Sequence, residues 1–425
     1  MKQFTPFFLI AMLHLATMKA QEFVQVAVGA SYSQQAFYTL SNNEKTVLAN
    51  ESWDLAFGTA AQGAAIFYNE AAKASFTGEA PQLSLYLAPT NNFADEVNLS
   101  LITDTLYNPE IDWDNGAFNS IKNENDPDDY GWGAFDTGTQ SILGNKVYAL
   151  QLRNGTWKKI FIESMANGIF TMKYANLDGT GENTVTINKA DYSGSPLAFF
   201  SFTSGTATAS PSGWDLLFTR YRTPLDPGDG EVIQYMVTGV LSAPGVEVAE
   251  ARNIDPETVD YTLYLDSLGS QLDIIGQDWK FFDLGASMWI VDLSRAYFVK
   301  TAGNHLWKLV FYTFDGSSTG NFTFEKTDLG PLSGVESPVS NFIDFGLFPN
   351  PATTEMTISF SLEESQKDLY IYLSNSLGQP VWQSRVQGNT GLNILEVHPK
   401  GLPAGIYTLT LGKGRDTVTT KVVIR

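Results

Sequence analysis

Short runs of alternating apolar and polar residues fill this chain, and they restrict its fold more than any other feature of the sequence. The runs are rich in Val, Ile, Thr, Tyr and Phe, and Gly, Asn and Asp interrupt them. Since successive side chains of a β-strand point to opposite faces, such runs predict half-buried strands joined by turns. Few windows have helical spacing, and the best is 254–269, with Pro256 near its first turn and Gly269 past its end. We therefore expect an all-β protein with a few short helices.

The central part of the chain repeats itself. Residues 32–57 and 192–218 both start with Tyr-Ser and end in Trp-Asp-Leu-x-Phe. Residues 148–162 and 297–312 follow in the same order, and each has a strand, a turn and a return through Trp-Lys. Matching phrases in one order favour an internal duplication over chance similarity between strands. We expect two β domains, over 21–191 and 192–330.

Particular residues of the repeat have expected roles. Asn154-Gly155 is a strong hairpin signal because both positions tolerate positive φ, and Gly303-Asn304 is expected to form the same turn with one residue more. The Trp residues of the shared phrase, Trp53 and Trp214, are predicted to lie in the core at a strand end. Asp54 and Asp215 then face the other side and can accept hydrogen bonds from a neighbouring turn.

Composition excludes several partners. The chain has 26 Lys and Arg against 46 Asp and Glu, a formal net charge of -20, and the acidity lies in the central region. Nucleic acid and anionic membranes are poor partners because both require clustered cations. There is no cysteine, which excludes disulfides, thiolate metal ligands, a Cys nucleophile and a lipidated Cys.

The N-terminus predicts export. Lys2 precedes an apolar stretch too short to span a bilayer, so residues 1–20 are expected to be a signal peptide cleaved between Ala20 and Gln21. No other stretch is long and apolar enough for a transmembrane helix. Residues 331–345 are rich in Pro, Ser and Gly and are expected to be a linker.

The last eighty residues, 346–425, carry three sequence pieces with a known meaning. They contain Phe-Pro-Asn-Pro, then Leu-Pro-Ala-Gly-Ile-Tyr, then a terminal Lys-Val-Val-Ile. This segment resembles the type A C-terminal sorting domain of the type IX secretion system of Bacteroidota. We expect it to fold as a small immunoglobulin-like β-sandwich, although the strand pattern alone equally describes an ordinary immunoglobulin-like module. The positions that match its motifs are Pro349, Asn350, Pro351, Gly405, Tyr407 and Lys421. The resemblance implies passage through the periplasm and outer membrane, removal of the tail by a sortase, and frequently attachment to surface lipopolysaccharide.

Residues 212–221 and 296–326 look like the haem-binding HmuY family of the same phylum. The resemblance is best over 192–330, and 21–191 looks like an expanded, divergent copy. It implies an all-β fold that holds haem iron between two axial side chains, His in some members and Met in others. Only His305 remains as a histidine in the central region, so a His–His pair is excluded there. Met236, Met288 and His305 are the candidate haem ligands, although an apolar-strand Met is usually core filler and a turn His is usually solvated.

Other chemistry finds less support in the sequence. Three acidic loops, at 123–130, 176–183 and 226–231, gather oxygen donors that suit calcium, but they are also ordinary β-turn compositions. No G-x-S-x-G elbow or HExxH motif is present, so an enzyme is not expected. Four Trp residues in Gly- and Asp-rich surroundings could stack on sugars or another flat ligand, unless they are buried between sheets: Trp113, Trp132, Trp279 and Trp289.

Taken together, these patterns predict an exported protein, secreted or attached to the outer-membrane surface. Its expected role is binding, of haem or another ligand. The alternative is a structural or adhesive surface protein without a small-molecule site.

Overall fold

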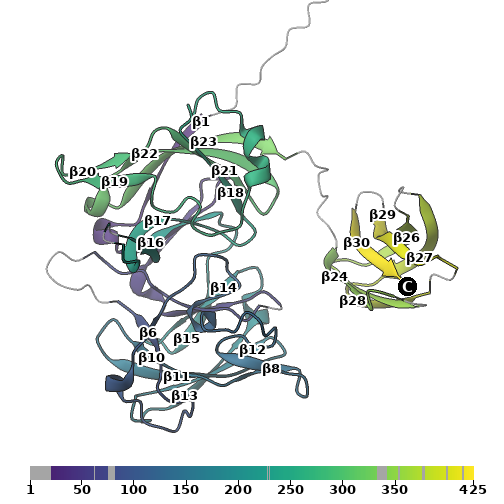
Figure 1. The fold of residues 1–425 in the computed structure, drawn as a ribbon, viewed down its shortest axis with the longest axis horizontal. Helices are drawn as coiled ribbons and strands as arrows, with labels where there is room; N and C mark the ends of the chain where they lie inside the picture. The colour runs from purple at the N-terminus through teal and green to yellow at the C-terminus, as the bar shows by residue number, and fades with distance from the viewer. Residues whose placement is uncertain are drawn as a thin grey trace, which may run out of the picture. The chain divides into compact units, whose positions relative to one another are not determined.

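The computed structural model describes residues 21–332, except 62, 75–81, 227 and 229, and residues 342–425, except 353–354, 376–378, 399–400 and 414–415. The chain forms two compact units, 1–332 and 333–425, which we name the body and the tail (Figure 1). Both are built from antiparallel strands, which confirms the all-β prediction. The signal peptide predicted at 1–20 and residues 333–341 of the predicted linker lie outside the described residues.

Four larger sheets form most of the described part of the body, and we name them A to D. Sheet A has the order β1 (Gln21–Ala27), β23 (Asn321–Pro331), β22 (His305–Phe314), β21 (Arg295–Lys300), β18 (Glu247–Arg252). Sheet B has the order β17 (Ile233–Ser242), β16 (Leu216–Leu225), β2 (Gln34–Tyr38), β3 (Lys45–Ala49). Sheet C has the order β15 (Thr206–Ala209), β14 (Leu197–Ser201), β4 (Leu55–Gly58), β5 (Ile66–Tyr68). Sheet D has the order β13 (Asn183–Asn188), β12 (Ile169–Ala175), β11 (Trp157–Ala166), β10 (Val147–Gln151), β6 (Ser84–Leu87), β7 (Thr105–Leu106).

Smaller elements complete the body. The hairpin of β8 (Gly133–Asp136) and β9 (Ser141–Gly144) joins sheet D through β11, and β19 (Lys280–Asp283) pairs only with β20 (Met288–Val291) among the described strands. The 3-10 helices are η1 (Ala30–Tyr32), η2 (Asn50–Ser52), η3 (Leu99–Leu101), η4 (Ala117–Asn119), η5 (Lys189–Tyr192), η6 (Tyr261–Ser267) and η7 (Gly316–Ser318). The helical window predicted at 254–269 is confirmed only at η6, which starts after Asp260 because the Asp260 side chain accepts the N–H of Thr262.

The sheets stack in the order A, B, C, D, and alternation along the strands explains the stack (Figure 1). On β2, the ring of Tyr38 lies edge-on to Phe324 of sheet A, whereas its neighbour Phe37 meets Phe199 of sheet C. On sheet C, Phe57 points the other way and packs on Phe170 of sheet D. The strands β2, β4, β5 and β14 of sheets B and C are therefore buried on both faces and read as nearly continuous apolar runs, whereas the edge strands β3 and β15 are largely exposed.

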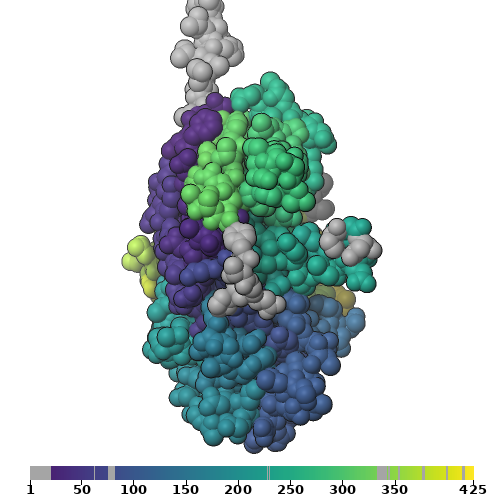
Figure 2. Space-filling view, turned by 90° about the vertical axis from the view of Figure 1, so that its left-hand side faces the viewer, coloured from purple at the N-terminus to yellow at the C-terminus, as the bar shows by residue number. Residues whose placement is uncertain are grey.

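The two copies of the repeat are intertwined. The strands β2–β3 and β4–β5 of the first copy correspond in order to β14–β15 and β16–β17 of the second. Yet β4 pairs with β14 and β16 pairs with β2, so sheets B and C each combine strands of both copies. β1 and β13 also correspond, because each precedes a 3-10 helix. Each pairs with a strand of the other copy: β1 of the first copy pairs with β23, and β13 of the second copy pairs with β12. Figure 2 shows the purple β1 beside the light-green β23.

Because of this exchange, the predicted boundary at 191/192 does not separate two domains. By the order of elements, the second copy starts at β13, before residue 192. All four sheets contain strands of both copies, so the described part of the body is one interlocked fold rather than two consecutive β domains. Pairing partners are set by long-range packing, which the alternation of single strands does not specify.

The repeated Trp-Asp phrase holds the two copies together. Trp53 and Trp214 are buried, as predicted. Asp54 of the first copy accepts the backbone N–H of Phe202 at 2.7 Å, just after β14 of the second copy. Asp215 of the second copy accepts the N–H of Leu40 at 2.8 Å, just after β2 of the first. The predicted hydrogen bonds from a neighbouring turn are thus confirmed, and they are reciprocal between the copies.

The two predicted hairpins are also present. β10 and β11 are joined through 152–156, where Gly155 has φ of 80°. β21 and β22 are joined through 301–304, where Asn304 has φ of 60°. The second loop is therefore shorter than the first, whereas the sequence pattern predicted it to be longer by one residue.

The tail is the small sandwich that the sequence predicts. One sheet has the order β24 (Phe342–Phe348), β25 (Met356–Leu362), β28 (Gly391–Val397), and the other has β27 (Pro380–Gly388), β26 (Gln366–Ser374), β29 (Gly405–Lys413), β30 (Asp416–Ile424). Apolar side chains of both sheets share one core. The predicted linker 331–345 is too long at both ends, because Pro331 ends β23 and Phe342 already pairs with Leu362 of β25.

We expect the exchange of strands to make the body fold as one unit. Fragments 21–182 and 183–332 each lack strands in all four sheets, so neither should show cooperative thermal unfolding alone. Mixed from denaturant, they should restore the circular dichroism spectrum and the transition of 21–332. A cooperative transition in either fragment alone would contradict the intertwined topology.

We expect Asp54→Ala to be more destabilising than Asp215→Ala. Asp54 also pairs with the largely buried Arg153 at 2.8 Å, so its loss leaves a buried charge without its partner and should cost about 3–5 kcal/mol. Asp215→Ala leaves one buried N–H without its acceptor and should cost about 1–3 kcal/mol. Urea unfolding at pH 7 measures both, and the reverse order would contradict this assignment.

Candidate functional site

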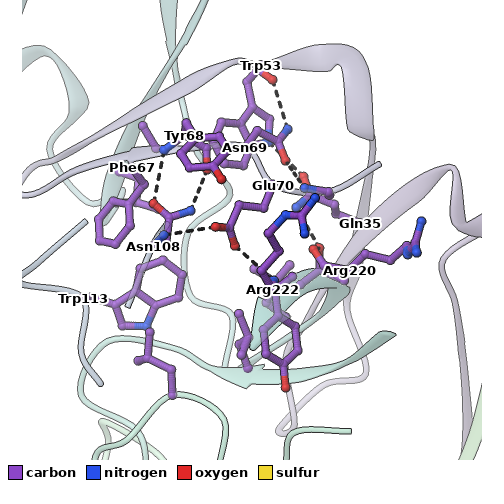
Figure 3. Close-up of a pocket in the computed structure, with 18 of the residues that line it drawn as sticks. Gln35, Trp53, Phe67, Tyr68, Asn69, Glu70, Asn108, Trp113, Arg220 and Arg222 are labelled. Atoms are coloured by element: carbon purple, nitrogen blue, oxygen red, sulfur yellow. Dashed lines mark hydrogen bonds between the residues drawn. The ribbon is translucent and has the colours of Figure 1, made fainter. Parts of the chain in front are cut away.

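A cavity of about 80 Å³ lies where sheets B and C face each other, and we name it the seam cavity. Its walls are mostly apolar and come from both copies of the repeat. Its lining includes Phe37, Trp53, Ala56, Phe67, Trp113, Leu197, Phe199, Leu217, Tyr221, Leu241 and Leu272, with the polar residues Gln35, Asn69, Glu70, Asn108, Glu110, Thr219, Arg220 and Arg222 (Figure 3).

Glu70 is the central polar group of this site, and in Figure 3 its carboxyl group points between Asn108 and Arg222. It follows β5 and accepts the backbone N–H groups of Asn108 at 3.0 Å and Arg222 at 3.2 Å. Burial raises the pKa of Glu70 to about 7, although these hydrogen bonds and the hydrogen bond with Tyr68 oppose the shift. Glu70 therefore connects a strand of the second copy to two segments of the first.

Glu110 is the second carboxyl group of the cavity. Burial raises its pKa to about 7 as well, and a hydrogen bond with Thr223 opposes the shift. Its Oε1 atom is buried and has no hydrogen-bond partner among the described residues. A buried acceptor without a partner is destabilising, so this oxygen atom favours a ligand that brings a hydrogen-bond donor.

Trp113 closes the cavity beside these carboxyl groups. Its indole N–H donates to the carbonyl of Ser242 at 2.8 Å, which ties the segment after β7 to the end of β17. The ring lies 5.5 Å from Phe67 and 5.8 Å from Trp214. The cavity thus combines aromatic walls with two carboxyl groups, an arrangement that can hold a small molecule with an apolar body and a donor group.

Met288 lies elsewhere, on the hairpin β19–β20. Its side chain is 53% exposed and lines a groove of about 480 Å³, which we name the Met288 groove. The aromatic lining of this groove comprises Phe282, Trp289, Tyr312 and Phe314. An exposed apolar cluster of this kind marks a binding surface more often than a scattered apolar residue does.

The other two predicted haem ligands are not brought to this groove. Met236 is half-buried on β17 opposite Arg222 and is not part of the groove lining. His305 starts β22, and its Nε2 lies 2.6 Å from an oxygen of Asp328. Trp289, next to Met288, contacts Phe314 at the other end of β22, which places His305 about 30 Å from the groove.

Other predicted residues have structural roles. Trp132 and Trp279 are fully buried, so neither ring can stack on a sugar, whereas Trp113 and Trp289 line cavities. In the acidic loops, Asp126 and Asp178 accept backbone N–H groups two residues ahead, as turn residues do. Within the described ranges, no three His, Asp or Glu side chains form a group that could hold a metal ion.

Sequence reasoning missed Glu70 and Glu110. Each is a single carboxylate in a loop, and no spacing distinguishes them from the other acidic residues of the chain. Burial gives them their properties, and it depends on strands far away in the sequence. Trp113 was identified as a candidate, and its conspicuous position in a Gly- and Asp-rich segment was the available signal.

The motif residues of the tail meet at the start and end of its fold. The Asn350 side chain donates to the carbonyl of Lys421 at 2.8 Å and accepts the N–H of Val423 at 2.9 Å. Pro349 and Pro351 flank this amide. On β29, Gly405 pairs with Ile424, and the Tyr407 hydroxyl donates to the carbonyl of Pro403 at 2.8 Å. The motif residues therefore join the first loop of the sandwich to its last strand, β30, mainly through the Asn350 side chain.

Comparison with known proteins identifies this tail. Residues 346–425 match the family described as the secretion system C-terminal sorting domain. The tail is a type A sorting domain of the type IX secretion system, and the protein is exported, to be secreted or attached at the outer-membrane surface. A search of the curated proteins found no match to the chain. None of the helices in the described ranges has the length and apolar character needed to cross a membrane.

We expect the buried carboxyl groups to make the body less stable as pH rises. The pKa of Glu70 is near 7 when folded and near 4.5 when unfolded, so the free energy of unfolding falls between these values and stays low above pH 7. Glu70→Gln removes this titration but places an amide NH2 against one of the two backbone N–H groups, so it should cost stability at pH 4.5. Its stability relative to the wild type should be about 2–3 kcal/mol more favourable at pH 8 than at pH 4.5.

Urea unfolding at both pH values measures this difference. The exposed Glu96→Gln is the matched control and should leave stability unchanged at both. Glu110 contributes in the same direction, so Glu70→Gln should remove only part of the decline. A Glu70→Gln protein whose stability falls between pH 4.5 and pH 8 as steeply as that of the wild type would contradict the assignment.

Proposed function

We propose that this exported protein is a ligand-binding protein of the cell surface whose ligand occupies the seam cavity. The observation that carries the proposal is the buried Oε1 atom of Glu110, which has no partner among the described residues of a mostly apolar cavity. Cavities with apolar walls, a few convergent polar groups and shifted pKa values are typical of small-molecule sites.

The chemistry of the lining favours an amine. Glu70 and Glu110 accept hydrogen bonds when ionised, and their charge then attracts a cation and repels a carboxylate. Arg220 and Arg222 also line the cavity, but their guanidinium groups donate to the carbonyls of Ala72 and Gln234. The rings of Trp113 and Phe67 can face an ammonium group favourably. A cavity of about 80 Å³ is smaller than the roughly 150 Å³ that holds benzene, so the apolar body is a short branched alkyl group.

Isobutylamine and isobutyrate test this proposal because they share one apolar body and differ in charge. We expect isobutylamine to raise the thermal midpoint of the body in a concentration-dependent way and isobutyrate to leave it unchanged. Glu110→Gln and the cavity-filling Ala56→Val should each weaken the amine effect at least tenfold, whereas Glu96→Gln should not. Equal effects of both compounds, or an amine effect that survives Glu110→Gln, would contradict the proposal.

Haem is a second candidate ligand, favoured by the exposure of Met288 in an aromatic groove. The resemblance of 192–330 to HmuY-like proteins supports it. The donors do not fit a two-ligand site formed from Met236, Met288 and His305, because only Met288 lies in the groove. The residues fit one thioether ligand and apolar walls for the ring.

A hemin titration of residues 21–425 tests this second candidate. We expect a saturable Soret band that Met288→Ala abolishes and that the control Met236→Ala leaves intact. A band lost with Met236→Ala, or no saturable band, would end the haem hypothesis. If neither isobutylamine nor hemin binds, the structural or adhesive role becomes the better explanation.

A further inference from the structure

A polar groove of about 420 Å³ lies on the outer face of sheet D, and we name it the tyrosine groove. It is lined by Tyr68, Gln82, Ser84, Tyr86, Thr105, Tyr107, Gln151, Leu152, Arg153, Gly155 and Arg222. Its volume falls within the range of roughly 300–1,000 Å³ seen for small-molecule sites. The groove shares Tyr68 and Arg222 with the seam cavity, but the rest of its lining comes from β6, β7 and β10 of sheet D and from the loops next to these strands.

Strand alternation builds this polar surface. Leu83, Leu85 and Leu106 point into the core between sheets C and D. Their neighbours therefore point outward, and pairing aligns them in rows: Tyr86 lies opposite Thr105, and Ser84 lies opposite Gln151. Hydroxyl and amide groups thus stand side by side on three adjacent strands.

Another part of the outer face is covered. Ala88, Phe93, Val97 and Ile102 pack over Val147 and Ala149, with Tyr86 at the edge of this cluster. The tyrosine groove starts where that apolar cover ends, at Tyr86. Polar residues at strand positions that face outward are expected on any sheet, but a concave row of them beside two partly exposed tyrosine rings, Tyr86 and Tyr107, is a recognition surface.

The groove is cationic in an acidic protein. The chain carries 46 Asp and Glu, yet the described lining has two arginines and no carboxylate. Arg153 is neutralised by Asp54 at 2.8 Å. Arg222 donates to the carbonyl of Gln234 and to Gln82, lies 5.6 Å from the Tyr107 ring, and forms no ion pair among the described residues. Its charge interacts with Glu70 of the seam cavity, but no carboxylate on the groove side neutralises it within the described lining.

We propose that the tyrosine groove binds an acidic sugar, such as a hexuronate unit of an oligosaccharide. Tyrosine rings stack on the apolar C–H face of a sugar, and Ser, Thr and Gln side chains supply paired donors and acceptors for its hydroxyl groups. The guanidinium group of Arg222 matches the carboxylate. A simple anion would use the arginine alone and leave the row of amides and hydroxyls without a purpose.

Trigalacturonate and the neutral maltotriose are the probes, each titrated calorimetrically into residues 21–425. We expect trigalacturonate to bind at least tenfold more tightly than maltotriose, with the difference shrinking at high salt. Tyr107→Ala should weaken binding at least tenfold, and Ser84→Trp should block the groove without removing a lining ring. Tyr235→Ala, an exposed tyrosine outside the groove, is the matched control.

Equal binding of both sugars would overturn the role of the carboxylate, and no binding of either would overturn the site. Trigalacturonate binding that persists in both Tyr107→Ala and Ser84→Trp would place the sugar elsewhere and also overturn the proposal. Circular dichroism checks that both variants fold. The amine test of the seam cavity uses a different probe and different variants, so the two proposals can fail separately.

Discussion

The reciprocal pairing of strands between the two copies is the interaction that organises the body. Because β4 lies against β14 and β16 lies against β2, sheets B and C bury both faces, and neither copy can complete them alone. The aspartates of the repeated phrase reinforce this arrangement, since each accepts a backbone N–H from the opposite copy. The seam cavity follows from the same geometry, because it forms where two exchanged sheets face each other.

Local patterns predicted the local structure well. Alternation gave the strands, Asn154-Gly155 gave a hairpin, and the repeated phrase gave both the buried tryptophans and the hydrogen-bonding aspartates. The exchange itself could not be predicted, because an apolar strand of a given length pairs equally well with its own copy or the other. The role of the carboxyl groups in the cavity could not be predicted for a related reason. The pKa of a loop glutamate is raised only when strands that are distant in the sequence bury it.

The structure separates sites that the sequence could not tell apart. Met288 and Trp289 border one groove, Trp113 and Glu70 another cavity, and His305 is engaged with Asp328. Residues considered together as haem ligands therefore belong to different surroundings. In the tail, by contrast, the motif residues converge, with the Asn350 amide joining the first loop to the last strand.

The position of β1 has a consequence for how the body matures. Gln21 lies opposite Thr327, so β1, the first described strand, can pair only after β23, the last strand of the body, is available. Chains with such distant contacts fold slowly and expose open strand edges on the way. A body that emerges from a translocation pore in the order of its sequence therefore stays incomplete until the segment next to the sorting domain has emerged. Pairing of β1 with β23 can therefore complete sheet A only when the whole sequence of the body is present.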